Sequence, residues 1–177
     1  MNFIATTIPG LLRIIPDVYE DNRGRFHRTF CGNELVEAGT QFTVRQGNLS
    51  DNLAKLTLRG FHYQKFPTLE AKVITCVTGA IYNVVIDLRP DSPTLYQWES
   101  LEVSAAERHS IHVPAGCANA FLTLDNNTSV HYYMSEYFVP DTYRGIRYND
   151  PFFNVSWPYL PEIISPRDAA FPDFLPS

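Results

Sequence analysis

Short runs rich in Val, Ile, Tyr, Phe and Thr alternate along the whole chain with turns built from Pro, Gly, Asn and Asp. Runs of about 4–8 residues bounded by such turns are typical of strands, because most helices need longer periodic segments. The pattern predicts an all-β sandwich or barrel. The expected strands cover residues 11–15, 25–30, 43–49, 56–63, 72–77, 80–88, 96–103, 109–113, 119–124 and 129–137.

The same pattern predicts several connections. Residues 73–77 and 81–87 are separated by Thr78-Gly79-Ala80, which indicates a tight hairpin. Short helices are expected over residues 33–38 and 162–170, the second interrupted at Pro166 because proline lacks an amide hydrogen. The tail after residue 158 contains repeated prolines, so we expect it to wrap around the barrel without adding strands.

Length and charge limit the classes of partner. No linker-like segment divides the 177 residues, so we expect one domain, residues 1–177. A net charge of −5 and the lack of a basic run argue against nucleic acid or an anionic membrane as partner. The absence of a long apolar stretch and of a signal peptide predicts a cytoplasmic protein. Cys31, Cys76 and Cys117 have unrelated spacings and are expected to be free, mostly buried thiols.

The segment Arg59-Gly60-Phe61-His62-Tyr63-Gln64 is the main candidate for chemistry. A histidine between two aromatic residues is partly desolvated and can be tuned as a general base. Lys72 alternates with Ile74 and Cys76, so its ammonium is expected to project into the same cavity. A base beside a fixed cation suits proton removal next to a carbonyl, because the enolate oxygen needs a counter-charge. From these residues alone, a packed histidine and an edge lysine remain the alternative.

A histidine and glutamine early in a small barrel, followed later by Pro-x-Gly-x-x-Asn, resemble the two motifs that usually supply metal ligands in cupins. In this chain the motifs offer His62, Gln64, Glu70 and Asn119. One imidazole, one carboxylate and two amides are a weak donor set for divalent transition metals. We therefore expect neither a metal nor another cofactor.

Eight motifs together resemble the nucleotide-sugar 3,5-epimerases typified by dTDP-4-dehydrorhamnose 3,5-epimerase. They follow the family's order from residue 21 to residue 168: Asp21-Asn22-Arg23-Gly24-Arg25-Phe26, Gln46-Gly47-Asn48-Leu49-Ser50, Leu58-Arg59-Gly60-Phe61-His62-Tyr63-Gln64, Asp87-Leu88-Arg89, Ser92-Pro93-Thr94, Gly145-Ile146-Arg147-Tyr148-Asn149-Asp150-Pro151, Trp157-Pro158 and Ser165-Pro166-Arg167-Asp168. The resemblance implies a cupin-type jelly-roll β-sandwich or barrel with short peripheral helices. It also implies a homodimer in which the N-terminal segment crosses to the partner.

The resemblance implies roles for four residues. His62 would be the general base, and Asp168 would orient and polarise its imidazole. Tyr132 would return a proton from the opposite face, and Lys72 would stabilise the enolate oxygen. Inversion needs removal on one face and delivery on the other, and tyrosine, with an ordinary pKa near 10, stays protonated at neutral pH. Without the resemblance, Tyr132 is interpreted as a packed aromatic and Asp168 as a solvated or helix-capping residue.

The resemblance also implies substrate contacts. Arg23, Phe26 and Arg59 would hold the nucleotide diphosphate, since arginine matches phosphate geometry. Gln46 and Asn48 would contact the sugar or a phosphate. Arg23 is equally consistent with a solvated turn residue.

Four positions depart from the family pattern. Asn119 stands where a histidine is usual, Asn83 where an aspartate is common and Arg28 where an acidic residue is common, while a usual Tyr-Tyr pair is Tyr137-Phe138 here. Because the proton-transfer residues are retained, we expect these positions to shape substrate recognition. They leave open action at one carbon only, a sugar without a 3-hydroxyl, or a base other than thymine. A CDP-linked 3,6-dideoxy-4-ketohexose that needs 5-epimerisation is one such substrate.

The sequence therefore predicts a cofactor-independent epimerase in deoxysugar biosynthesis. It would invert C3, C5 or both of a nucleotide-diphosphate-linked 4-keto-6-deoxyhexose through an enolate. Two alternatives remain: a keto-isomerase that moves the carbonyl between C3 and C4 on the same scaffold, and a non-catalytic sugar-binding cupin. The joint presence of His62, Lys72, Tyr132 and Asp168 argues against the non-catalytic alternative.

Overall fold

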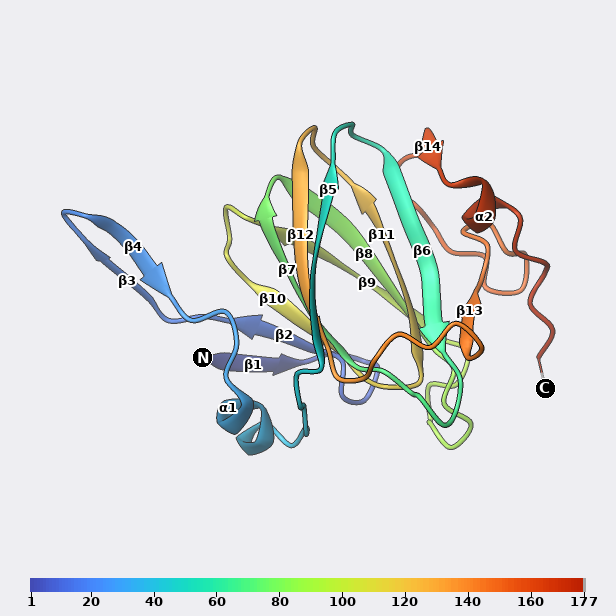
Figure 1. The fold of residues 1–177 in the computed structure, drawn as a ribbon, viewed down its shortest axis with the longest axis horizontal. Coiled ribbons are helices and arrows are strands. Elements are labelled where there is room, and N and C mark those ends of the chain that lie inside the picture. Colours follow the sequence, from blue (N-terminus) through green and yellow to red (C-terminus); the bar gives the residue numbers. More distant parts are fainter. Residues whose placement is uncertain (177) are drawn as a thin grey trace.

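Two six-stranded sheets face each other in the computed structural model, which describes residues 1–176 (Figure 1). The strands are β1 Asn2–Ala5, β2 Leu12–Ile15, β3 Val18–Asp21, β4 Gly24–His27, β5 Gln46–Asn52, β6 Thr57–Gln64, β7 Lys72–Thr78, β8 Ala80–Asp87, β9 Trp98–Ser104, β10 Ser110–Val113, β11 Cys117–Thr123, β12 Thr128–Met134, β13 Tyr143–Gly145 and β14 Ile163–Ile164, and the helices are α1 Gly32–Glu37 and α2 Pro166–Ala169. The first sheet has the order β1-β2-β10-β7-β12-β5, and the second has the order β13-β6-β11-β8-β9 with β14 paired to β6. The predicted all-β, cupin-type sandwich with short peripheral helices is confirmed.

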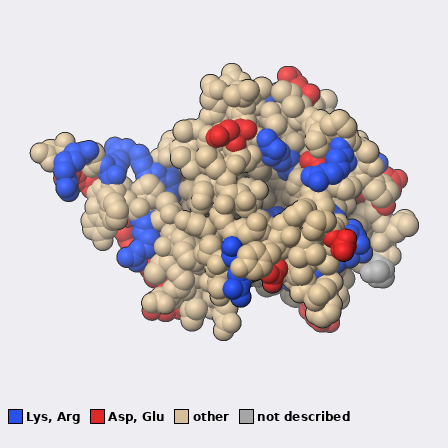
Figure 2. All heavy atoms as spheres, in the orientation of Figure 1, with Lys and Arg blue, Asp and Glu red and all other residues tan. Residues whose placement is uncertain are grey.

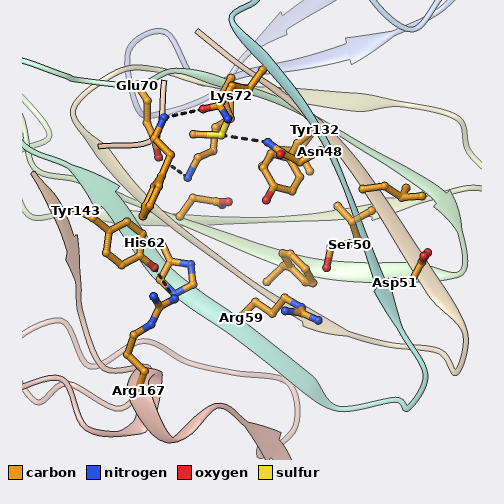
Figure 3. A pocket seen from close by; sticks show the side chains of 18 residues that line it. Asn48, Ser50, Asp51, Arg59, His62, Glu70, Lys72, Tyr132, Tyr143 and Arg167 are labelled. Carbon is orange, nitrogen blue, oxygen red and sulfur yellow. Dashed lines mark hydrogen bonds and ion pairs between the residues drawn. The ribbon is translucent and has the colours of Figure 1, made fainter. Parts of the chain in front are cut away.

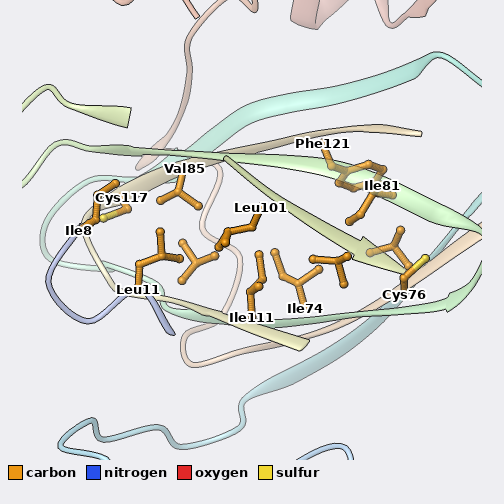
Figure 4. Close-up of a cluster of buried hydrophobic side chains, with 13 residues drawn as sticks. Ile8, Leu11, Ile74, Cys76, Ile81, Val85, Leu101, Ile111, Cys117 and Phe121 are labelled. Carbon is orange, nitrogen blue, oxygen red and sulfur yellow. The ribbon is translucent and has the colours of Figure 1, made fainter. Parts of the chain in front are cut away.

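Buried apolar side chains form a continuous cluster in the space between the two sheets (Figure 4). Ile74 and Ile111 come from the first sheet, while Ile81, Val85 and Leu101 come from the second. Alternation along each strand points these residues inward, and burying each such side chain is worth about 1.5–3 kcal/mol. This packed cluster fixes the separation of the sheets, so side chains beside it can surround a cavity.

The connection between β7 and β8 is a corner and not a hairpin. The predicted hairpin at Thr78-Gly79-Ala80 is wrong, because β7 pairs with β10 and β12, whereas β8 pairs with β11 and β9. Gly79 has a φ of 72°, a left-handed conformation that glycine adopts without steric cost. The tight turn therefore carries the chain from one sheet to the other. The local turn signal could not reveal which strands pair.

The C-terminal tail also differs from the prediction. Residues Ile163–Ile164 form β14, which pairs in parallel with β6, so the tail does add a strand. Pro166 begins α2 instead of interrupting a helix, because the first helical position needs no amide donor. Ser165 caps this helix by accepting a hydrogen bond from the Asp168 amide at 3.1 Å. This short helix places Asp168 beside β6.

The N-terminal part departs from the predicted strand limits. The expected strand over residues 25–30 ends at His27, and it pairs only with β3, which was not predicted. This β3–β4 hairpin extends away from the sandwich (Figure 1). The strand expected at residues 43–49 begins at Gln46 and runs to Asn52, while β1 and β13 were missed. The cysteines are free, as predicted, with Cys76 and Cys117 buried. Neither helix within residues 1–176 is long and apolar enough to cross a membrane.

Candidate active site

A cavity of about 500 Å³ opens between the two sheets beside the packed core, and Ile74, Phe121 and Val130 of that core form part of its lining. Its walls come from β5, β7 and β12 on one side and β6 and β11 on the other, with β13 and α2 at the rim. Figure 2 shows the surface hollowed on this side of the molecule, with basic side chains near the rim and on the projecting hairpin. Such a cavity is large enough for a sugar with part of a larger ligand.

A bulge in β6 turns two polar side chains into this cavity. Phe121 and Asn119 of β11 are two residues apart, but their partners Arg59 and His62 are three residues apart. The extra residue on β6 is accommodated at Gly60, whose φ is 117°. A Cβ at Gly60 would lie 2.6 Å from both Ala120 Cα and Asn119 O, so only glycine fits there.

The partly buried His62 and the buried Asp168 form a pair at the cavity wall. His62 Nε2 lies 2.9 Å from Asp168 Oδ1, and the Asp168 side chain is only 4% exposed. The Gly60 amide donates to Asp168 Oδ2 at 3.3 Å, which holds the carboxylate in place. Because a carboxylate only accepts, Nε2 carries the proton and Nδ1 of the neutral ring keeps its lone pair. The arrangement leaves His62 able to accept a proton through Nδ1.

The surroundings of His62 keep the imidazole neutral. Burial lowers its pKa from the ordinary value of 6.5, and the positive charges of Lys72 and Arg167 lower it further. The hydrogen bond to Asp168 and its negative charge act in the opposite direction. The pKa of Asp168 is lowered by its contacts with His62 and Gly60, so this residue is an anion at neutral pH. A neutral imidazole beside a carboxylate is a suitable general base.

Tyr132 and Lys72 face His62 from the opposite sheet (Figure 3). Tyr132 lies on β12 opposite Ile74 of β7, and Lys72 lies two residues before Ile74, so their side chains share the cavity face. Burial and the negative charge of Glu70 raise the pKa of Tyr132 above its ordinary value of 10. The phenol is therefore protonated at neutral pH and able to donate.

Lys72 is held by Glu70, which sequence analysis had considered only as a cupin metal-ligand position. The Lys72 Nζ lies 2.9 Å from Glu70 Oε1, and the two side chains are 12% and 4% exposed. The backbone beside Glu70 is fixed because the Ala71 amide donates to Ser135 Oγ at 2.8 Å and Ala71 O accepts from the Ser135 amide at 3.0 Å. The ammonium is thus fixed at the cavity wall.

Asn119 lines the cavity, whereas Asn83 lies behind it. Asn119 Nδ2 donates to Asn83 Oδ1 at 2.8 Å and to Val84 O at 3.1 Å. Both amide hydrogens of Asn119 are used, so its Oδ1 is the atom left for a ligand, and this atom only accepts. Asn83 is fully buried, with 0% exposure. Toward the cavity the pair thus presents the acceptor Oδ1 of Asn119, while the amide nitrogen of Asn83 is buried behind it without a hydrogen-bond partner among residues 1–176.

Three further predicted binding residues also line the cavity. Arg59 Nε donates to Asn52 Oδ1 at 2.7 Å, which leaves the rest of its guanidinium for a ligand. Gln46 and Asn48 lie on β5 at alternate positions and point to the same face. Gln46 Oε1 accepts from the Phe138 amide at 2.6 Å, so its remaining donors are available.

Four of the predicted substrate-binding residues, in addition to the buried Asn83, do not line the cavity of their own chain. Arg23 is on the turn of the β3–β4 hairpin, where it pairs with Asp21, and Phe26 on the same hairpin is 73% exposed. Arg28 pairs with Glu34 of α1 at 2.6 Å. Tyr137 is 56% exposed.

Sequence reasoning missed two side chains beside the base. The Tyr143 ring centroid lies 5.4 Å from that of His62, and Arg167 Nη2 donates to the Tyr143 hydroxyl at 3.1 Å. Phe138 packs edge-on against Tyr143 at 5.4 Å. Arg167 directly precedes Asp168 in the motif Ser165-Pro166-Arg167-Asp168, so the sequence did indicate a position near the site for this residue. Tyr143 lies in a short strand that no local pattern indicated.

The four cupin ligand positions are engaged with the protein. Gln64 Nε2 donates to Tyr137 O at 3.0 Å, and its Oε1 accepts from the Val139 amide at 2.6 Å. Asn119 uses both amide hydrogens, as described above. Within residues 1–176, no group of three or more His, Cys, Asp or Glu side chains is arranged to hold a metal ion. Gln64 therefore fixes the backbone at Tyr137 and Val139, in the segment that follows β12.

Comparisons with known proteins give one consistent result. The sequence model of the family described as dTDP-4-dehydrorhamnose 3,5-epimerase matches residues 5–175. The dTDP-4-dehydrorhamnose 3,5-epimerase of Mycolicibacterium smegmatis is 39% identical over 168 residues, which cover 94% of this chain and 82% of that protein.

Solved structures agree with the sequence matches. The dTDP-4-dehydrorhamnose 3,5-epimerase of Bacillus anthracis, solved with TDP and pyrophosphate bound, superposes with a TM-score of 0.94 at 34% identity, covering 98% of this chain and 99% of that chain. A 3′-monoepimerase from Streptomyces bikiniensis, solved with dTDP-quinovose, has a TM-score of 0.87 at 32% identity, covering 95% of this chain and 85% of that chain. The similarity thus includes enzymes described as acting at two carbons and one described as acting at a single carbon.

Proposed function

The chain belongs to the dTDP-4-dehydrorhamnose 3,5-epimerase family, and on that premise we propose that it epimerises a nucleotide-linked 4-keto-6-deoxyhexose in deoxysugar biosynthesis. It is an isomerase of the epimerase type. The observation that carries the proposal is that His62 on one sheet, paired with Asp168 of α2, faces Tyr132 and Lys72 on the other sheet across one cavity. We place the enzyme in the cytoplasm.

The first step is proton removal by His62. Nδ1 takes the proton from a carbon next to the C4 carbonyl, and the C–H electron pair moves into the ring as the carbonyl π electrons move onto oxygen. The resulting enolate oxygen is stabilised by the Lys72 ammonium. Asp168 stabilises the imidazolium that forms, because its charge and hydrogen bond favour the protonated ring.

The second step is proton delivery by Tyr132. Its hydroxyl gives a proton to the same carbon from the opposite face, which inverts the configuration and collapses the enolate to the ketone. The phenolate then regains a proton from solvent, and His62 releases its proton to solvent. Each turnover at a carbon therefore exchanges one carbon-bound hydrogen with water.

Proton NMR in deuterated water tests this function directly. We expect dTDP- or CDP-linked 4-keto-6-deoxyhexoses to lose the signal at C3, C5 or both, with inversion and with the carbonyl remaining at C4. The His62→Ala variant should slow exchange by about two to four orders of magnitude, the usual contribution of a general base. Near-normal exchange in that variant would remove His62 from the role of base. Movement of the carbonyl to C3 would support a keto-isomerase, and binding without exchange would support the sugar-binding alternative.

We further propose a homodimer in which the β3–β4 hairpin of one copy completes the cavity of the other. The hairpin extends from the sandwich and exposes Tyr19 (68%) and Phe26 (73%), while the Arg23 side chain is 86% exposed. An aromatic ring and a guanidinium at the edge of a second cavity suit a nucleotide diphosphate. This arrangement gives Arg23 and Phe26 a substrate contact that their own chain does not offer.

Mixed subunits test the shared site. Two variant proteins are needed: one carries both Arg23→Ala and Phe26→Ala, and the other carries His62→Ala. Each variant should be inactive alone. Mixing them in equal amounts should restore about half of wild-type activity per mixed dimer, or about a quarter per total protein, since one site of each mixed dimer then contains an intact hairpin and an intact cavity. No recovery in mixtures shown by light scattering to contain dimers would contradict the crossing, and a monomeric protein would contradict the dimer.

A further inference from the structure

Glu70 has one carboxylate oxygen that the proton-transfer mechanism does not use. Its Oε1 pairs with Lys72 Nζ at 2.9 Å. Its Oε2 is buried and, among residues 1–176, has no hydrogen-bond partner. The side chain is 4% exposed and lines the cavity (Figure 3). A buried carboxylate oxygen without a donor is costly, so a site with this geometry favours a ligand that brings one.

The carboxylate faces the interior of the site. Its negative charge raises the pKa of Tyr132 and also that of Tyr143, and both of these side chains line the cavity. Glu70 therefore acts on the same space as the residues around the sugar. A carboxylate accepts hydrogen bonds and cannot donate them, so the matching ligand group is a hydroxyl or another donor.

The position of Lys72 identifies which sugar hydroxyl lies at this oxygen. In the proposed mechanism Lys72 Nζ binds the C4 oxygen, and Glu70 is in direct contact with Lys72. The carbons next to C4 in a 4-keto-6-deoxyhexose are C3, which carries a hydroxyl, and C5, which carries a methyl group. The hydroxyl adjacent to the bound carbonyl is therefore the one at C3.

We propose that Glu70 is a substrate-binding residue that accepts a hydrogen bond from the C3 hydroxyl and so selects 4-keto sugars that retain this group. The inference rests on the proposed function, because it uses Lys72 as the group that binds the C4 oxygen. It also makes a 3-deoxy sugar, such as a 3,6-dideoxy-4-ketohexose, the poorer substrate class.

Three sugars linked to thymidine diphosphate test the inference: a 4-keto-6-deoxyhexose, its 3-deoxy analogue and its 2-deoxy analogue. Two quantities are measured for each, kcat/KM for deuterium exchange and Kd by calorimetry. We expect the wild-type protein to prefer the 3-hydroxy sugar over the 3-deoxy sugar by about ten- to a hundredfold in both quantities. Glu70→Ala should reduce this ratio to within about threefold, while the preference relative to the 2-deoxy sugar stays unchanged.

Two additional variants make the test specific. Glu70→Gln keeps the side-chain shape and should lower the 3-hydroxy preference in the same direction, so the result does not depend on whether Glu70→Ala folds. Glu102→Gln on the exposed face of β9 is the matched control and should keep the wild-type ratio.

The outcomes separate this inference from the proposed function. If Glu70 acts only by positioning Lys72, each Glu70 variant will lower kcat/KM by the same factor for all three sugars, and the inference is overturned. A wild-type protein without a 3-hydroxy preference, or a change confined to the 2-deoxy ratio, also overturns it. If wild-type protein exchanges no hydrogen in any sugar, the epimerase proposal fails, and the Kd ratios still decide the role of Glu70. If no sugar binds, both proposals are wrong.

Discussion

Arg59 and His62 are three residues apart on β6, yet both side chains line the same cavity. In a regular strand residues separated by three point to opposite faces. The bulge at Gly60 removes this conflict by opposing two residues of β6, Gly60 and Phe61, with one residue of β11, Ala120. The same glycine donates its amide to Asp168, so one backbone feature orients the arginine, the base and the partner of the base.

Gly60→Ala should therefore destabilise the fold by about 2–4 kcal/mol, since it adds both a strained positive φ and a clash with β11. Chemical denaturation measures this change. Gly24 has a similar φ of 122° with nothing within 4 Å of an added Cβ, so Gly24→Ala is the matched control and should cost less. Equal losses in the two variants would show that the close approach to β11 does not matter.

The pH dependence of activity should report His62. The neutral ring is the active form, so kcat/KM should fall as pH drops below the lowered pKa of His62, which is under 6.5. Asp168 raises this pKa and Lys72 lowers it. Asp168→Asn should therefore move the acid limb of the plot of kcat/KM against pH to lower pH, and Lys72→Met should move it to higher pH.

Both variants will also reduce the maximal rate, so the position of the limb is the decisive readout. Lys65→Met, an exposed lysine outside the cavity, serves as a control and should leave the limb in place. Shifts of the same sign in the Asp168 and Lys72 variants would contradict the assignment of the limb to His62.

Tyr132→Phe should separate proton removal from proton delivery. The variant keeps His62 and Lys72, so deuterium should still enter the sugar with the original configuration while inversion largely stops. NMR of the recovered sugar distinguishes exchange with retention from exchange with inversion. Inversion at the wild-type rate would mean that another group delivers the proton.

Activity should survive extensive chelation. The reason is the donor set: Gln64 and Asn119 are tied to the protein backbone or to Asn83, and amides are weak ligands for transition metals. Turnover after treatment with a chelator and metal analysis of the purified protein check this prediction. Lost activity that one metal restores would favour a metal-dependent cupin.

The Asn119–Asn83 pair should limit the choice of substrate. Asn119 presents only an acceptor, and a mismatched hydroxyl partner in a buried site typically costs about 1–3 kcal/mol. We expect the protein to process dTDP-4-keto-6-deoxyglucose poorly or at one carbon only. Asn119→His combined with Asn83→Asp should increase its kcat/KM with that sugar by about one to two orders of magnitude. Efficient inversion of both carbons by the unaltered protein would contradict the specificity argument and leave the epimerase assignment intact.

Local patterns were enough to predict the strand-rich fold and most inner strands. The alternation of Lys72 with Ile74 is an example, because side chains two apart on a strand must share a face whatever the strand pairs with. The short helices at α1 and α2 were also detectable. The residues around His62 and the alternation at Lys72 indicated a candidate base and cation, the family resemblance added Tyr132 as the acid, and all three line one cavity.

Tertiary structure decided the features that depend on partners distant in sequence. Whether Gly79 makes a hairpin or a corner depends on the strands that flank β7 and β8, and no turn signal contains that information. Asp168 reaches His62 only because the C-terminal tail pairs with β6 from more than a hundred residues away. The sequence does not reveal that Lys72 pairs with only one carboxylate oxygen of Glu70 and leaves the second oxygen without a partner among residues 1–176. The sequence by itself thus determined which strands form and which chemical groups are present, because these follow from local periodicity and residue type. The pairing of strands and the hydrogen-bond partners of each group were decided by the packing of the whole chain.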